Sequence, residues 1–357
     1  RYLSGFTGSM GSLLITRDHQ YIVADFRYFE QVGKECPDYT LFAKNVGADK
    51  WFATLVGEAG LAGKRIGFEA GDMSVQEFQA LKKAIDAMPE DDRPKLLAAP
   101  SLISDLRAIK EPEELALLQR AVDVGDATFV HAAAYLEAGM TEIQVALEIE
   151  RHARANGAEF LSFPTIVGAA AHGAIPHHQP TDYVIQKGDP VVIDMGVMVD
   201  GYCSDLTRTI VCGGKASDPD FQRVYDIVLV AQRTAEELIK AGMTGDEGHM
   251  LAHNVIAEAG YGENFGHGLG HGVGLQVHEA PRLARTAKDL LEDGMIVTVE
   301  PCIYLTGRFG VRIEDQCVIE NGKVRAMSRA PKLMACCPTS ARRRQSPSKR
   351  STAPSRT

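Results

Sequence analysis

Two aspartates on a predicted hairpin are the residues of this sequence best placed to bind a cation. An Asp-Gly pair at 200–201 separates two mostly apolar runs, which is typical of a two-residue hairpin turn. In the register set by that turn, Asp194 lies opposite Thr207, and Asp205 lies on the same sheet face. Neighbouring buried carboxylates are costly unless a positive charge neutralises both, and a metal ion would supply that charge. Taken alone, this stretch also fits a solvated hairpin with scattered aspartates.

A second predicted hairpin, within residues 295–320, carries two more acids. Its strands hold Glu300 and Glu314. If the loop is the three residues 306–308, these glutamates lie directly opposite each other. A four-residue loop would place them on opposite faces of the sheet, so their pairing depends on the loop length.

An internal repeat explains why there are two such hairpins. The tetrapeptide Ala-Gly-Met-Thr occurs at 138–141 and again at 241–244. Each copy follows a long amphipathic helix and opens a new helix through a capping box. The new helices are predicted to end at Gly157 and Gly260, and a His-containing loop and two strands follow each of them. This order predicts a duplicated helix–helix–sheet unit with a cleft between its halves.

A glycine- and histidine-rich loop at 265–279 lies between the two hairpins. Its imidazoles are those of His267, His271 and His278, and its glycines allow close packing around them. No strand–turn–helix frame supports dinucleotide binding, and the second His of a zincin helix is missing. Beside four acids on two related hairpins, these histidines favour a metal site.

The composition is that of an ordinary globular protein with two domains. The chain has 357 residues, 45% of them hydrophobic and 24% charged, and no apolar run long enough to span a membrane. A net charge of −9, with basic residues concentrated near the end, argues against a nucleic-acid partner. Seven cysteines, an odd number without a C-x-x-C pair, suit a reduced, cytoplasmic protein. The start without Met predicts that a few N-terminal residues are missing.

The chain is predicted to contain three parts. Residues 1–105 alternate strand and helix signals and form a small α/β domain. Residues 113–335 hold the repeat, the acids and the histidines, and they form the second predicted domain. Residues 338–357 are basic, lack hydrophobic periodicity and are expected to be a disordered tail.

The motifs DMGVMVDGYCSDLTRT, GHGLGHGVGLQVHE, VEPCIY and RIED, in this order, resemble those of the pita-bread metallopeptidases. Within that group the chain is similar to the Xaa-Pro peptidases, aminopeptidase P and prolidase. Its start, RYLSGFTGS followed by DFRYFEQV, resembles their creatinase-type N-terminal domain. The resemblance implies an α/β N-terminal domain and, over residues 113–335, a catalytic α+β pita-bread domain with pseudo-twofold duplication.

The resemblance also implies a dinuclear metal site. Its five ligands would be Asp194, Asp205, His271, Glu300 and Glu314, with Asp205 and Glu314 bridging two divalent ions. Four carboxylates and one imidazole form an oxygen-rich set that suits Mn²⁺, with Co²⁺, Fe²⁺ and Zn²⁺ as alternatives. Such ions would activate water to attack the carbonyl before proline.

Further catalytic roles follow from the same resemblance. Glu300 would also take a proton from the nucleophile. The supporting residues would be His278 near the substrate, His177 as an active-site His (or its neighbour His178), His267 in the proline pocket, and Arg312 as an ion-pair partner that orients Glu314.

The leading functional hypothesis is an Xaa-Pro aminopeptidase that acts on peptides with proline in second position. The nearest alternative is an Xaa-Pro dipeptidase, or prolidase, and a non-catalytic pita-bread binding module is the alternative from another class. The family further implies a homodimer.

Overall fold

The computed structural model describes residues 1–44, 48–99 and 101–332. The chain divides into two compact units, one of residues Arg1–Arg107 and one that begins at Ala108. The basic tail predicted for 338–357 lies outside the described residues. No helix in the described ranges combines the length and the apolar character needed to cross a membrane.

The first unit is an α/β domain, as predicted. A three-stranded sheet has the order β1-β2-β3, and a separate parallel pair is formed by β4 and β5. The predicted capping box starts a helix after Ser74, whose main-chain N–H donates to Glu77 at 2.9 Å. The elements are β1 (Ser12–Ile15), β2 (Gln20–Ala24), α1 (Phe29–Glu35), β3 (Thr40–Ala43), α2 (Ala48–Glu58), β4 (Arg65–Phe68), α3 (Val75–Asp86), β5 (Lys95–Ala98) and α4 (Leu102–Ala108).

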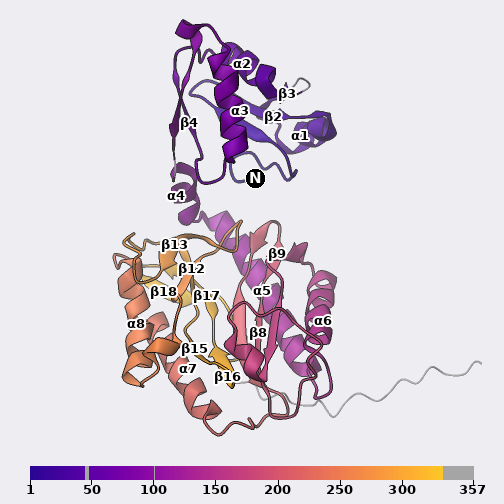
Figure 1. Ribbon diagram of the computed structural model, residues 1–357, viewed down its shortest axis with the longest axis vertical. Coiled ribbons are helices and arrows are strands. Elements are labelled where there is room, and N and C mark those ends of the chain that lie inside the picture. The colour runs from indigo at the N-terminus through magenta and orange to yellow at the C-terminus, as the bar shows by residue number, and fades with distance from the viewer. Residues whose placement is uncertain (45–47, 100, 333–357) are drawn as a thin grey trace, which may run out of the picture. The chain divides into compact units, whose positions relative to one another are not determined.

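Four helices of the second unit flank its strands in two pairs (Figure 1). They are α5 (Pro112–Tyr135), α6 (Glu142–Ala155), α7 (Phe221–Leu238) and α8 (Gly245–Glu258). Helices α6 and α8 each have 14 residues and begin directly after the threonine of one repeated tetrapeptide. Helix α7, which precedes the second tetrapeptide, begins at Phe221 with Asp220 at its N-cap position. The helix pairs therefore follow the duplication seen in the sequence.

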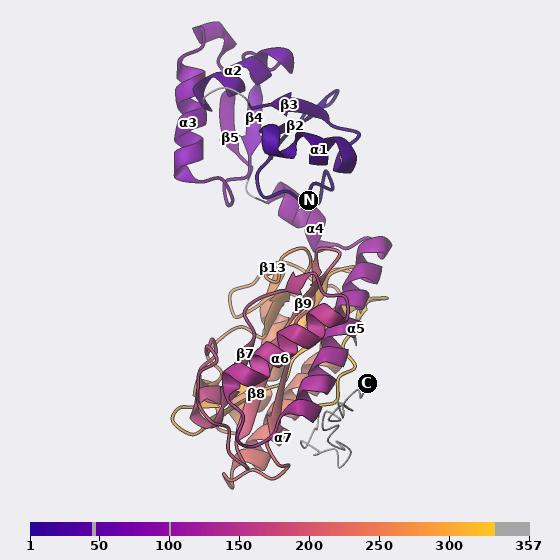
Figure 2. The ribbon, with the colours of Figure 1, turned by 90° about the vertical axis from the view of Figure 1, so that its right-hand side faces the viewer.

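The strands of the second unit also fall into two sets. The first set is β6 (Phe160–Leu161), β7 (Ile166–Ala169), β8 (Pro190–Met195), β9 (Val197–Val199), β10 (Tyr202–Cys203) and β11 (Leu206–Val211). The second set is β12 (Gly270–Gly272), β13 (Glu279–Leu283), β14 (Ile296–Val299), β15 (Cys302–Leu305), β16 (Phe309–Arg312), β17 (Asp315–Glu320) and β18 (Lys323–Ala326). Helix α6 packs on β7, as Figure 2 shows, and α8 packs on β13.

Both predicted hairpin registers are confirmed. Asp200 and Gly201 form the first turn with φ values of 49° and 81°, and Thr207 pairs with Asp194. In the second hairpin, residues 306–308 form the three-residue loop, because Leu305 pairs with Phe309. The pairs Val299–Asp315 and Cys302–Arg312 continue one register, which places Glu300 opposite Glu314.

The two halves meet along a seam between β11 and the segment that joins β16 to β17. The main-chain N–H of Glu314 donates to the Thr207 carbonyl at 3.0 Å, and the main-chain N–H of Arg312 donates to Thr209 Oγ1 at 3.0 Å. Apolar residues of α5, α6, α7 and α8 cover the outer faces of the strands. The seam brings the acids of the two hairpins together.

Candidate metal centre

All five predicted ligands line one pocket of about 350 Å³ in the second unit. Asp194 projects from β8, Asp205 precedes β11, His271 lies in β12, and Glu300 and Glu314 follow β14 and β16. His271 Nε2 lies 3.3 Å from Glu300 Oε1 and 3.6 Å from Asp205 Oδ2. The ligand atoms of Asp205, His271 and Glu314 all lie within 4.8 Å of one another. The side chains are thus as close as a shared cation requires.

Electrostatics favour a cation at the same place. Burial, followed by the charges of Glu314 and Asp194, raises the pKa of Asp205 well above its ordinary value. Burial and the charges of Glu300 and Asp194 do the same to the pKa of Glu314. Asp194 Oδ1 is buried and has no hydrogen-bond partner among the described residues. Four acids in this space fit divalent metal ions, which would remove the repulsion and bind the unpartnered oxygen.

Arg312 contacts a different acid from the one predicted. Its Nη2 donates to Asp194 Oδ2, so the predicted direct ion pair with Glu314 is replaced by one with Asp194. The link to Glu314 passes through Thr207: Arg312 Nε donates to Thr207 Oγ1 at 3.2 Å, and that hydroxyl donates to Glu314 Oε2 at 2.6 Å. The reason is the register, because Thr207 lies opposite Asp194 and fills the space between the two carboxylates.

Three histidines lie at the wall of the pocket. The His278 ring packs against that of His271 with 4.3 Å between centroids, and burial followed by the neighbouring His271 lowers the pKa of His278. His267 Nε2 lies 3.2 Å from the hydroxyl of Tyr304, a half-buried residue that sequence reasoning missed. His177 is exposed and lines the pocket, whereas its neighbour His178 is buried and points elsewhere. The structure therefore separates the two adjacent histidines.

The comparisons with known proteins agree with this architecture. Residues 116–321 match metallopeptidase family M24, and residues 1–109 match the creatinase/prolidase N-terminal domain. The chain belongs to metallopeptidase family M24. It is a hydrolase of the pita-bread fold, and its family depends on a dinuclear metal centre.

Named relatives of this M24 chain act on Xaa-Pro substrates. An Xaa-Pro dipeptidase of Pyrococcus horikoshii is 42% identical over 225 residues, which cover 63% of this chain and 64% of the relative. The structure of an Xaa-Pro dipeptidase from Bacillus anthracis has a TM-score of 0.86 at 38% identity and covers 94% of this chain and 92% of that one. An X-Pro aminopeptidase from Thermotoga maritima has a TM-score of 0.84 at 33% identity, with the same coverage of 94% and 92%.

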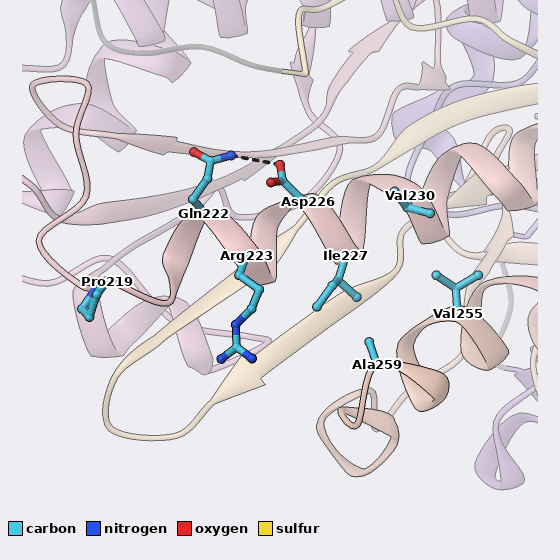
Figure 3. Close-up of a pocket in the computed structure, with 8 residues that line it drawn as sticks. All are labelled: Pro219, Gln222, Arg223, Asp226, Ile227, Val230, Val255 and Ala259. Carbon is cyan, nitrogen blue, oxygen red and sulfur yellow. Dashed lines mark hydrogen bonds between the residues drawn. The ribbon is translucent and has the colours of Figure 1, made fainter.

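A second groove on the M24 unit holds none of the predicted site residues. It has a volume of about 630 Å³ and lies between α7 and α8. Figure 3 shows side chains of both helices along it, with Gln222 hydrogen-bonded to Asp226 at 2.9 Å. The residues that line this groove include no cluster of acids and imidazoles. The candidate active site is therefore the pocket lined by the five predicted metal-ligand residues.

Proposed function

We propose that this chain is an Xaa-Pro dipeptidase that hydrolyses the bond before proline. The observation that carries the proposal is the convergence of four carboxylates and one imidazole in a single pocket of an M24 chain. The substrate class is supported by the two dipeptidases to which the chain is similar. The non-catalytic alternative is disfavoured because every position of the proposed ligand set offers a donor atom.

We propose that the metal ions are held by Asp194, Asp205, His271, Glu300 and Glu314. When bound, two divalent ions supply Lewis-acid chemistry, which activates water and polarises the scissile carbonyl. Mn²⁺ is the proposed metal because most of the donor atoms are carboxylate oxygens.

The chain's own side chains would perform the remaining steps. Glu300 Oε1 accepts a hydrogen bond from Thr298 Oγ1 at 3.2 Å, which orients the carboxylate as the proposed proton acceptor. His278 has a lowered pKa, so its imidazole is neutral at neutral pH and able to hydrogen-bond the substrate without adding charge. His177 and His267, which both line the pocket, would contact substrate, and Arg312 would keep Asp194 in place.

An Xaa-Pro aminopeptidase is the second candidate function. It is supported by the similarity to the Thermotoga maritima enzyme, whose TM-score of 0.84 is close to the 0.86 of the Bacillus anthracis dipeptidase. The two activities share the reaction and differ in whether the pocket accepts residues beyond proline. A homodimer and a cytoplasmic location stay predictions from the sequence.

Substrate length is the experimental test. Protein stripped of metal and reloaded with Mn²⁺, Co²⁺ or Zn²⁺ should cleave Ala-Pro, while Ala-Pro-Ala should remain intact. Release of alanine from the tripeptide would instead support the aminopeptidase.

A Glu314→Gln variant should lose cleavage by more than about 100-fold, and Glu320→Gln, at a distant strand end, is the matched control. Lack of cleavage of both peptides with every metal would contradict the peptidase proposal.

A further inference from the structure

A second buried cluster of acid and histidines lies outside the metal centre. Glu142 is the first residue of α6, and its side chain is fully buried. It is grouped with His172 and His178, two histidines that the proposed chemistry does not use. The cluster therefore needs an explanation of its own.

The Glu142 carboxylate is saturated with hydrogen bonds. Oε1 accepts from the main-chain N–H of Ala169 at 2.8 Å and from His172 Nδ1 at 2.9 Å. Oε2 accepts from His178 Nε2 at 2.9 Å, and from the N–H and Oγ1 of Thr181 at 2.9 Å and 2.7 Å. Two fixed amide N–H groups face the carboxylate, and a cation there would be repelled by them. The arrangement favours histidines that act as donors over histidines that bind a metal.

These bonds close a loop at both of its ends. Ala169 ends β7, and Thr181 lies twelve residues further along, so one carboxylate joins the two ends of segment 169–181. Inside the loop, the main-chain N–H of His178 donates to the carbonyl of Ile175 at 3.2 Å, which forms a tight turn. His177 lies within this turn and lines the pocket, while His178 is held on the other side by Glu142.

A close contact fixes the middle of the same loop to β16, the strand that precedes Glu314. A Cβ atom added at Gly310 in β16 would lie 1.9 Å from the carbonyl oxygen of Gly173. Arg312, two residues after Gly310, reaches the carbonyl of Pro176 at 3.5 Å. With both ends closed by Glu142 and the middle packed on β16, the loop has little freedom to move.

We infer that Glu142 is a positioning residue, which holds the two ends of loop 169–181 together and thereby sets the position of His177 in the active site. It touches neither the substrate nor the proposed metal ligands and acts through the loop. The inference rests on the proposed function, since His177 has a catalytic consequence only if the pocket is the active site.

A Glu142→Gln substitution tests the inference with little change of shape. The amide cannot accept all five bonds, so its NH₂ group must face at least one donor. We expect faster hydrogen exchange of the amides in 169–181, a 10- to 100-fold lower kcat/KM for Ala-Pro, and an unchanged metal content, in line with about 10²-fold costs for small misplacements. Glu148→Gln is the matched control, because Glu148 lies on the same helix and also pairs with a histidine, His131 of α5. It should leave the hydrogen exchange of 169–181, kcat/KM for Ala-Pro and the metal content unchanged.

A double-mutant cycle distinguishes positioning from general destabilisation. In a His177→Ala background, Glu142→Gln should lower kcat/KM for Ala-Pro much less than it does in the wild type, because both changes act on the same interaction. Independent, multiplicative losses or unchanged exchange would overturn the inference, as would the loss of one bound metal ion per chain in Glu142→Gln. If that variant fails to fold, Thr181→Val removes a single donor and serves instead. A wild-type protein that cleaves no peptide would overturn the proposed function and the role of His177 together. The hydrogen-exchange data would then show separately whether Glu142 holds loop 169–181 in place.

Discussion

Thr207 is the residue through which two acids of the centre and Arg312 contact one another. Its hydroxyl donates to Glu314 and accepts from Arg312, which in turn holds Asp194. Both sides of this link are buried, so no solvent can replace the hydroxyl. A single side chain in the middle of a strand therefore couples ligands from both halves of the fold.

Thr207→Val should keep the shape of this residue and remove the link. We expect kcat/KM for Ala-Pro to fall by about 10-fold, because Arg312 Nε and Glu314 Oε2 each lose a partner and both acids shift. Thr128→Val is the control, since Thr128 is equally buried but contacts His152 away from the pocket. Equal activity of the Thr207 and Thr128 variants would show that the link is dispensable.

At the scale of elements, the two hairpins deliver the acids and β12 delivers the imidazole. β12 lies so close to β14 that a Cβ at Gly270 would meet the Thr298 carbonyl oxygen at 1.9 Å. Two hydrogen bonds maintain this approach: the main-chain N–H of Glu300 donates to Leu269, and that of His271 to Thr298 Oγ1. Close packing here sets the distance between His271 and Glu300.

Gly270→Ala should separate these strands. We expect a loss of stability of about 1–3 kcal/mol from overpacking, together with weaker metal binding, measured by thermal unfolding and metal titration. Gly266→Ala lies in the same loop, where an added Cβ meets nothing within 4 Å, and should be near neutral. Similar melting temperatures for the two variants would contradict the close approach.

The hairpins were predictable from the sequence because their registers depend on local turn chemistry. Positive φ at Asp200 and Gly201, and a loop of three residues after Leu305, suffice to pair Asp194 with Thr207 and Glu300 with Glu314. The partner of Arg312 was not predictable, since its ion pair crosses between the two halves.

The hydrogen bonds between Glu142 and loop 169–181 were not predictable for a similar reason. Its five donors come from a loop that follows in the sequence but has no periodic pattern, and only the packing of α6 on β7 brings them together. The helices α1, α2 and α4 of the first unit are short or weakly patterned, and they too appear only in the structure.

At the scale of the whole molecule, metal binding should stabilise the fold. The cation would relieve repulsion among buried carboxylates and bridge the seam between the halves. At a free concentration 100 times the dissociation constant, binding contributes about 2.7 kcal/mol, which corresponds to a rise of about 5–10 °C in melting temperature. Chelation should therefore lower the melting temperature, and adding Mn²⁺ back should raise it again. In Glu314→Gln the addition should have little effect.

His249 gives the stability a dependence on pH that is separate from the metal. Burial, followed by the charges of His253 and Arg285, lowers the pKa of His249 to about 4, and neither ring nitrogen has a hydrogen-bond partner among the described residues. In the unfolded state the His249 side chain is protonated as the pH falls below about 6.5, whereas in the folded state it stays neutral down to about pH 4. The stability that neutral His249 contributes is therefore fully present above pH 6.5 and is lost as the pH falls toward 4.

His249→Phe should remove this dependence while it keeps an aromatic ring beside Phe265. Between pH 7.5 and pH 5.5 the wild type should lose about 1 kcal/mol more of its free energy of unfolding than the variant does. Urea unfolding at the two pH values provides the measurement. Parallel losses in both proteins would show that His249 is not buried as a neutral side chain.

The seam between the halves also bears on how long the protein survives in its folded form. Ligands from both halves would bind the same cations, so the metal would have to dissociate before the halves could separate. Metal-bound protein would then unfold rarely, and a protease that cleaves only unfolded chains would degrade it slowly. The supply of metal in the cell would thus set the lifetime of the protein as well as its activity.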